Sequence, residues 1–336
     1  MPGLGPDILC MIHPASRLEV IVHSRADGRS AVKASAYTAR TTFQDARRGQ
    51  RFSASRRGGL LSHELVSWSG DAESLWTAAE QAETRGNARV ARELRPSLPA
   101  ELPLPEQVRL VRGFCLWLRD TYGVAAQADI HAPRFHDPAL ERRLAAEVSS
   151  QGRERYLAAL SDPSITNLNY HAHILITTRE VCRETGAFGP KTRILDDRKS
   201  GPEEITRMRM EWEKRTNAAL QRIGSPARID MRSYAAMSTA GDAPEGLVAQ
   251  GHLGPRRAAR SRRLTAETGH DSSAAGRRRE KIRTHNAQLW QSWLMLRALE
   301  REKSREEAER IAQDREQARR ATGAKERERL HAAKSA

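Results

Sequence analysis

The segment HAHILITT, residues 171–178, constrains this chain more than any other feature of its sequence. It opens with His171 and His173 and continues as an apolar, β-branched run, which is typical of a buried strand and not of a helix. Residues i and i+2 of a strand point to the same face of its sheet. The segment therefore predicts a strand with two imidazoles directed at one point.

A third histidine, His131, ends another strand-like run, VAAQADIH. If the two strands are neighbours, three imidazole nitrogens meet, and this donor set suits Mn, Zn, Fe or Ni while leaving an open position for a substrate. The residues alone leave a second interpretation open, in which the two strand histidines serve packing or lie at the surface.

The charge of the chain favours a polyanionic partner. Its 336 residues include 57 Lys and Arg against 42 Asp and Glu, a formal net charge of +15. Such an excess attracts nucleic acid over a long range. The alternative is a solvated charged surface, and part of the excess does lie in a charged tail. Basic residues also cluster within the predicted globular part, at Arg47, Arg48, Arg51, Arg56 and Arg57.

The cysteines and the N-terminus bear on the compartment. Cys10, Cys115 and Cys182 show no C-x-x-C spacing, so we expect reduced thiols and neither a disulfide framework nor a cysteine zinc site. No apolar run has the length of a membrane span, and the N-terminus lacks the layout of a signal peptide. We expect a cytoplasmic protein without membrane insertion, with Met11 as a candidate for the true start.

Apolar spacing and end signals predict the secondary structure. Strands are expected at residues 18–23, 124–131 and 171–178. A polar loop or a frayed extension is expected at 41–59, and a charged, partly helical insertion at 135–168. Helices are expected after Ser30 as N-cap, around 104–123 with Leu110, Val111, Phe114 and Leu118 buried, and around 203–224 with Ile205, Met208 and Trp212 on one face.

Residues 72–93 have two interpretations. Leu75, Trp76 and Ala79 stand at helical spacing, which predicts a helix. The alternative is that the helix ends earlier and residues 90–94 form a strand, because Pro96 cannot lie inside a helix.

Composition divides the chain into four parts. We expect a flexible N-terminus at residues 1–17, a compact domain at 18–255, a basic linker at 256–280 and a charged helical tail at 281–336. Leu289, Trp293 and Leu296 form an apolar patch at the start of the tail. The rest of the tail is either a solvated single helix with i,i+4 ion pairs or an arm that contacts DNA.

Several motifs, in order, resemble the MobA/MobL plasmid mobilisation relaxases, a branch of the histidine-x-histidine endonucleases. The histidine strand is similar to the family's metal motif, and the segment around Tyr37 is similar to its catalytic-tyrosine segment. The resemblance covers residues 18 to about 255. The remaining matching segments are LWTAAEQAETRGNARVARELRPSLPAEL, KTRILDDRKSGPEEI, WEKRTN, RIDMRSY and HLGP.

The resemblance implies an α+β fold, an antiparallel sheet with helices packed against it, in an enzyme that cuts and rejoins one DNA strand at a plasmid origin of transfer. Tyr37 would be the nucleophile that forms a 5′-phosphotyrosyl link. His131, His171 and His173 would hold a divalent ion, Mn or Mg, with Zn as the alternative. Glu93 would lie near the active centre as general base, partner of a ligand or surface carboxylate. Neither ATP nor an organic cofactor is implied.

The implied partners are single-stranded DNA, plasmid origin DNA, accessory mobilisation proteins and a type IV secretion coupling protein.

Two features depart from the family pattern. The interval between His131 and His171 is long, so His136 is a rival third ligand if the insertion displaces His131, and Met231 stands where the family often has histidine. Alternative functions are a rolling-circle replication initiator or transposase of the same superfamily, and a non-catalytic nucleic-acid-binding protein.

Overall fold

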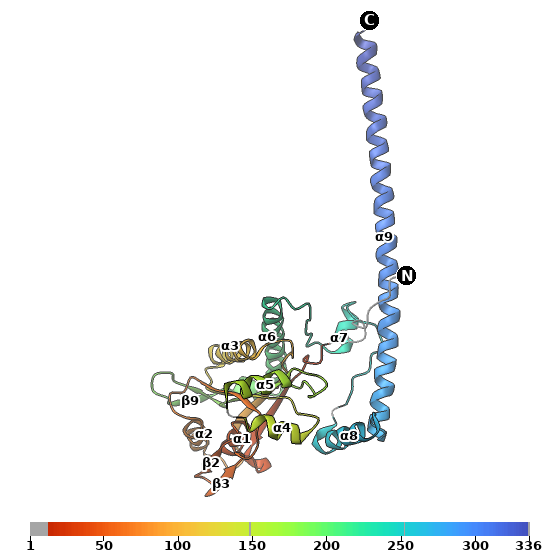
Figure 1. Ribbon diagram of the computed structural model, residues 1–336. Coiled ribbons are helices and arrows are strands. Elements are labelled where there is room, and N and C mark those ends of the chain that lie inside the picture. Colours follow the sequence, from red (N-terminus) through yellow and green to blue (C-terminus); the bar gives the residue numbers. More distant parts are fainter. Residues whose placement is uncertain (1–12, 148, 252, 335–336) are drawn as a thin grey trace. The chain divides into compact units, whose positions relative to one another are not determined.

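The computed structural model describes residues 13–147, 149–251 and 253–334. The chain forms two compact units, one of residues Ile12–Met231 and one that includes Arg232–Ala336 (Figure 1). Met11, Cys10 and most of the predicted flexible N-terminus lie outside the described residues. Within the remainder of that segment, Ala15 is buried in the core.

A five-stranded antiparallel sheet forms the centre of the first unit, in the order β1-β5-β7-β6-β4. The strands are β1 (Leu18–Ser24), β4 (Leu60–Val66), β5 (Arg89–Pro96), β6 (Ala126–His131) and β7 (His171–Ile176). The strands β6 and β7, which carry the three predicted ligands, are direct neighbours, with His131 opposite His171. The predicted α+β class with an antiparallel sheet is confirmed.

Helices cover both faces of this sheet (Figure 1). On one face α3 (Leu104–Tyr122) and α6 (Ser200–Arg222) bury an apolar cluster that includes Ala172, Ile174 and Ile176 of β7. On the other face α1 (Ala31–Thr38) and α2 (Ala72–Gln81) pack against Leu175. Because side chains alternate along a strand, His171 and His173 lie on the face that carries α1 and α2.

The local signals of three helices act as expected. The Oγ of Ser30 accepts a hydrogen bond from the Lys33 amide and caps α1. Gly123 ends α3 in the left-handed region, with φ 68°. The stripes predicted for α3 and α6 are buried, apart from the half-buried Ile205.

For residues 72–93 the alternative with a strand is correct, since α2 ends at Gln81 and residues 89–96 form the strand β5.

The prediction of a loop at residues 41–59 is wrong. Strands β2 (Thr42–Asp45) and β3 (Gln50–Ser53) pair there as a hairpin, with Phe43 opposite Phe52 and Gly49 in the turn at φ 62°. Most residues of this hairpin are polar, so its sequence shows no apolar alternation from which a strand could be predicted. The aromatic pair across the two strands is the contact that favours this register.

The charged insertion contains α4 (Pro138–Ala145) and α5 (Ser150–Leu160). Phe135 stacks on Tyr156 with ring centroids 5.7 Å apart, and Leu160 is fully buried. The insertion therefore has its own apolar anchors and leaves β6 and β7 paired. The smaller elements of this unit are η2 (Arg25–Asp27), β8 (Arg179–Val181), β9 (Phe188–Lys191) and η3 (Arg193–Leu195).

The second unit is helical, with α7 (Tyr234–Thr239), α8 (Gly254–Thr268) and α9 (Ala274–Lys334). The predicted basic linker at residues 256–280 contains α8 and the start of α9, and its role as a linker stays a prediction. Arg and Ala are good helix formers, and Gly269, with φ 76°, is the C-cap of α8 and not a sign of a flexible segment.

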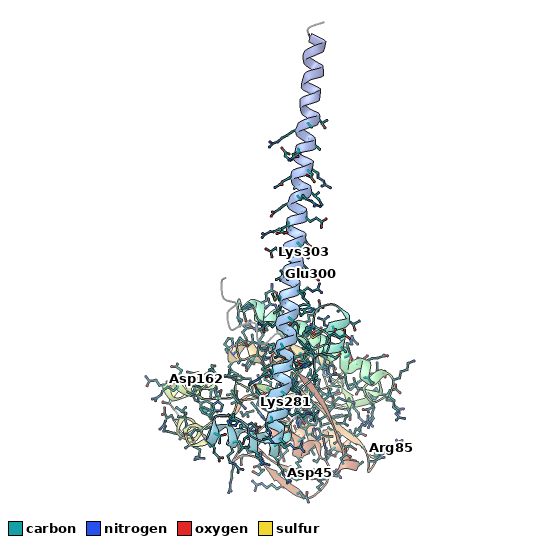
Figure 2. All side chains as sticks on the ribbon, turned by 90° about the vertical axis from the view of Figure 1, so that its right-hand side faces the viewer. Asp45, Arg85, Asp162, Lys281, Glu300 and Lys303 are labelled. Carbon is teal, nitrogen blue, oxygen red and sulfur yellow. The ribbon has the colours of Figure 1, made fainter. Side chains whose placement is uncertain are left out.

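The helix α9 extends as a single rod whose side chains point outward on all sides around Glu300 and Lys303 (Figure 2). Ion pairs at i,i+4 join Arg305 to Glu309 and Arg320 to Glu316. At its start Trp290 is buried, whereas Leu296 of the predicted patch is 60% exposed. The first compact unit ends at Met231, and the functional domain limits near residue 255 stay a prediction.

None of the helices in the described part of the chain has an apolar stretch long enough to cross a bilayer. The two cysteines that are described, Cys115 and Cys182, are free thiols.

Candidate metal centre and its tyrosine

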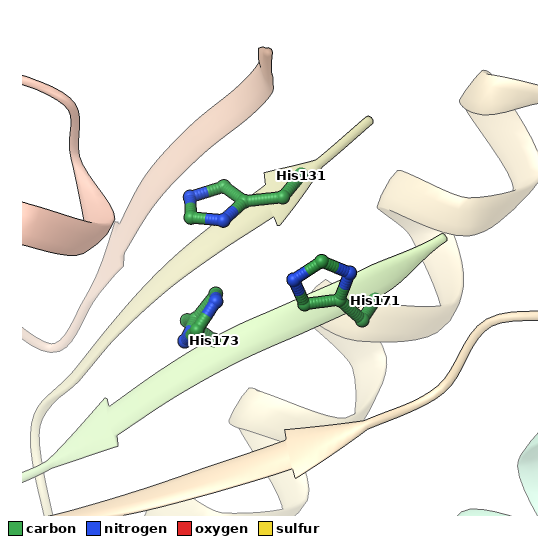
Figure 3. Close-up of side chains that lie close together, drawn as sticks. All are labelled: His131, His171 and His173. Carbon is green, nitrogen blue, oxygen red and sulfur yellow. The ribbon is translucent and has the colours of Figure 1, made fainter. Parts of the chain in front are cut away.

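Three histidines meet over the two central strands. His131 ends β6, and His171 and His173 stand two residues apart on β7 (Figure 3). One ring nitrogen of each lies within 4.8 Å of the others. The antiparallel register is the cause, because it sets His131 opposite His171 and leaves His173 on the same face.

The hydrogen bonds of His171 and His173 fix which nitrogen is free. Nδ1 of His173 donates to Oε1 of Glu93 at 2.6 Å, and Nδ1 of His171 donates to the backbone carbonyl of Asn169 at 3.0 Å. In both rings Nε2 therefore keeps its lone pair, which is the atom that a metal ion binds.

His131 has the opposite arrangement. Its Nε2 lies 2.7 Å from the carbonyl oxygen of Thr38, which only accepts, so Nε2 carries the proton. Its Nδ1 lies 3.1 Å from Nη2 of Arg40, which only donates. The lone pair of His131 is thus on Nδ1 and accepts a hydrogen bond from Arg40.

Burial keeps His131 and His171 neutral. It lowers the pKa of His131 to about 2 and that of His171 to about 4. Neutral imidazole is the form that ligates a metal. The donor set, three imidazoles with convergent nitrogens, thus fits a divalent ion.

Glu93 is a buried partner of one of these rings, not a surface carboxylate, since only 2% of it is exposed. It stands on β5 opposite Leu175, so His173 is its diagonal neighbour on β7. Nε2 of His23, on the other neighbouring strand, donates to Oε2 at 2.8 Å. Arg95 donates to both oxygens, from Nε at 2.6 Å and from Nη2 at 3.1 Å.

The charge of Glu93 follows from these contacts. Burial alone would raise the pKa of Glu93, but the hydrogen bonds from His173, His23 and Arg95 outweigh it, and the pKa lies well below its usual range. The carboxylate is therefore ionised, and four donors occupy its two oxygens.

Tyr37 stands at the edge of the histidine cluster. It lies on α1 and is exposed, with its ring edge-on to that of His173 at a centroid distance of 6.3 Å. The guanidinium carbons of Arg40 and Arg57 lie 4.7 and 5.2 Å from the centre of the phenol ring. The phenol thus lies between two guanidinium groups and the histidine cluster.

A buried polar network fixes α1 on the sheet. Oε1 of Gln127 accepts hydrogen bonds from Ser35 Oγ and Trp76 Nε1, both at 2.6 Å. Its Nε2 donates to Oδ2 of Asp129 at 2.5 Å and to Oγ1 of Thr38 at 3.1 Å. These residues join α1, α2 and β6, so the position of Tyr37 is set relative to His131.

The alternatives raised by the sequence lie elsewhere. His136, the rival ligand, has its Nε2 3.2 Å from the carbonyl oxygen of Pro163. Tyr170, which precedes the histidine strand, is buried in the cluster under α3 and α6. Met231 also packs against that cluster.

Two residues that contact the site, Arg40 and His23, were not predicted from the sequence. Nothing local in the sequence distinguishes them from other basic residues.

The chain matches the MobA/MobL family over residues 29–263. It is 36% identical over 258 residues to the mobilization protein MobL of Acidithiobacillus ferridurans, an alignment that covers 73% of this chain and 63% of that protein. It is 33% identical over 107 residues to the conjugal transfer protein TraA of Rhizobium radiobacter, covering 27% of this chain and 10% of that protein. The chain thus spans less than two thirds of the length of these curated relatives.

Two solved structures are similar to this chain in part. One comes from work on the molecular basis of vancomycin resistance transfer in Staphylococcus aureus, with 22% identity and a TM-score of 0.49, covering 65% of this chain and 98% of the other. The other is the conjugative relaxase TrwC in a metal-bound complex with oriT DNA, with 10% identity and a TM-score of 0.36, covering 82% and 98%. The family match over residues 29–263 extends across well over half of the sequence, and the chain belongs to the MobA/MobL family.

Proposed function

We propose that this protein is a relaxase that nicks and rejoins one DNA strand at a plasmid origin of transfer and so starts conjugative mobilisation. Membership of the MobA/MobL family supports this, as do relatives named for mobilisation and conjugal transfer. The observation that carries the proposal is the exposed Tyr37 ring beside His173 and its two partner histidines.

The reaction is a transesterification with Tyr37 as the nucleophile. Oη of Tyr37 attacks the scissile phosphorus while the bond from phosphorus to O3′ breaks. The phenolic proton passes to solvent, and the departing O3′ takes up a proton. A phenol has an ordinary pKa of about 10, so it reacts at neutral pH only where cations favour its ionised form. The phosphotyrosyl link keeps the bond energy, so the reverse attack by the 3′-hydroxyl rejoins the strand without ATP.

His131, His171 and His173 are the residues that would hold a divalent ion. When bound, that ion polarises the scissile phosphate and offsets charge in the in-line transition state. Imidazole nitrogen suits Zn²⁺ better than Mg²⁺, which prefers oxygen ligands. The donor set therefore favours Zn²⁺ over Mg²⁺, and Mn²⁺ stays a candidate because three protein ligands leave positions for phosphate oxygens.

Of the three roles open for Glu93, the contacts favour positioning over general base catalysis. A base needs a free lone pair directed at the proton that it accepts, but four donors occupy the two oxygens of Glu93. The carboxylate orients the ring of His173 and holds its proton on Nδ1, so that Nε2 is left for a metal ion.

Exposed arginines of the β2–β3 hairpin and the segment after it support a DNA strand as the partner. Arg51, Arg56 and Arg57 are exposed on and after the β2–β3 hairpin, and Arg57 reaches the Tyr37 ring. Guanidinium groups bind phosphate well. Accessory mobilisation proteins, a secretion coupling protein and a cytoplasmic location stay predictions from the family resemblance.

A plasmid-nicking assay tests the proposal. The protein is incubated with supercoiled plasmids that carry the DNA flanking its own gene, with Mn²⁺, with Zn²⁺ or with chelator. We expect metal-dependent conversion to the open circular form at one strand position within a transfer origin. Cutting at a replication origin would assign the chain to replication instead, and binding without cutting would make it a non-catalytic nucleic-acid-binding protein.

A further inference from the structure

Arg40 stands between the tyrosine and the histidines, and the chemistry described above does not use it. It follows α1 in the left-handed region with φ 53°, although it is not a glycine. Such a backbone conformation is uncommon for a non-glycine residue and is found more often at functional sites than elsewhere. The amide of Thr41 donates to the carbonyl of Ala36 at 3.1 Å and closes the helix end around it.

The guanidinium of Arg40 touches both halves of the site. Nη2 donates to Nδ1 of His131 at 3.1 Å, and Nη1 donates to the backbone carbonyl of Tyr37 at 3.2 Å. The guanidinium carbon lies 4.7 Å from the centre of the Tyr37 ring. Arg40 therefore bridges the proposed nucleophile and a proposed metal ligand.

Arg40 also lacks a counter-charge. Within the described part of the chain no carboxylate forms an ion pair with it, and its buried Nε has no hydrogen-bond partner. The other buried arginines near the sheet are paired, Arg25 with Glu80 and Arg92 with Asp196. A partly buried cation with an unused donor is costly unless an anion binds there.

We propose that Arg40 is a further catalytic residue, whose guanidinium binds the scissile phosphate between Tyr37 and the three histidines. This inference rests on the proposed relaxase function and supplies the cation that the phenol requires. The unused Nε–H and a second guanidinium N–H match two oxygens of a phosphate in planar, bidentate geometry. The bound cation stabilises the charge that develops on the phosphate oxygens in the transition state.

The same contact predicts competition with the metal. His131 has one lone pair, on Nδ1, and Arg40 occupies it. A metal ion that takes this nitrogen must displace the guanidinium, and the positive charge of Arg40 opposes the ion as well. Arg40 therefore moves from His131 toward the phosphate when the site fills, and its removal makes metal binding tighter.

Arg40→Gly is the variant that tests this, because glycine accepts the left-handed backbone without strain and keeps the fold. Arg40→Lys keeps the charge without the planar fork. Metal affinity is measured by titration calorimetry with Zn²⁺ and with Mn²⁺, and cleavage by single-turnover assays with origin DNA at saturating metal. Arg57→Ala is the matched control for metal binding, since Arg57 also lies over the Tyr37 ring.

For Arg40→Gly we expect cleavage to fall by about 10²- to 10³-fold, the loss typical of removing one preorganised donor. Metal affinity should rise by roughly tenfold, the value of one charge-assisted hydrogen bond. Arg40→Lys should lose less cleavage than Arg40→Gly, and Arg57→Ala should leave metal affinity unchanged. If the wild type cuts and Arg40→Gly retains more than a tenth of its rate, or binds metal no better, this inference is overturned alone. A wild type that does not cut overturns the proposed function too.

Discussion

Replacing Glu93 by glutamine tests how the histidine cluster is held. The carboxylate accepts hydrogen bonds from His173, His23 and Arg95 and is 2% exposed. Glutamine has nearly the same shape, but its amide nitrogen donates, so one of its two polar atoms must face a donor. The change also leaves Arg95 without its buried counter-charge.

The expected losses follow from these contacts. Removing one partner of a fully buried ion pair costs about 3–5 kcal/mol. Because the Arg95 side chain is 35% exposed, we expect the free energy of unfolding to fall by less, about 1–3 kcal/mol. Loss of the carboxylate behind a ligating histidine weakens metal binding by roughly 10- to 100-fold. Because the ligands themselves remain, saturating metal should restore most of the cleavage rate.

The assay combines chemical denaturation, metal titration and cleavage as a function of metal concentration. Glu19→Gln is the matched control, because Glu19 also lies near Arg95, at 4.0 Å, but its side chain is 42% exposed. We expect that control to change the free energy of unfolding by less than about 1 kcal/mol. If Glu93→Gln binds metal like the wild type yet cannot cut at any metal concentration, Glu93 is a general base and the positioning role is wrong.

Three further predictions concern the surroundings of the site. His131→Ala should abolish metal binding, whereas His136→Ala should leave it intact; the reverse in a calorimetric titration would move the third ligand to His136. Gln127→Leu should lower the free energy of unfolding by about 3 kcal/mol or more in denaturant melts, because the buried donors of Ser35 and Trp76 lose their acceptor and Asp129 loses a donor. The hydrogen bond to Asp129 raises the pKa of His63, so the stability it contributes is present below pH about 6.5 and is lost as pH rises through the higher folded pKa. His63→Gln should flatten this pH dependence of unfolding, and an unchanged profile would contradict it.

The parts of the fold that the sequence predicts are those with local causes. Alternation along residues 171–176 sets His171 and His173 on one face, and caps at Ser30 and Gly123 fix two helix ends. The β2–β3 hairpin was missed because one aromatic pair carries its register. The helices within residues 256–280 were missed because a composition rich in arginine and glycine does not distinguish a capped helix from a flexible segment.

Only the residues of the site that form a local sequence pattern, such as the histidine pair on one strand, could be predicted from the sequence. The pairing of β6 with β7, which brings His131 to His171, is a tertiary contact that spacing alone leaves open. His23 reaches Glu93 only through the register of β1 with β5. Arg40 is positioned by the left-handed turn that follows α1. Such a turn is usually predicted from a glycine or asparagine, and an arginine does not indicate it.

The central claim is that Tyr37 is the nucleophile, and one measurement tests it most directly. The protein is incubated with metal and an origin strand labelled downstream of the cut, and the products are separated on a denaturing gel. Wild type should give a protein band that carries the 5′ end of the downstream fragment, and digestion should map the link to the Tyr37 peptide. Tyr37→Phe lacks only the phenolic oxygen and should bind DNA and metal without forming the adduct. If Tyr37→Phe still forms the adduct and Tyr170→Phe does not, Tyr37 is not the nucleophile and the account is contradicted.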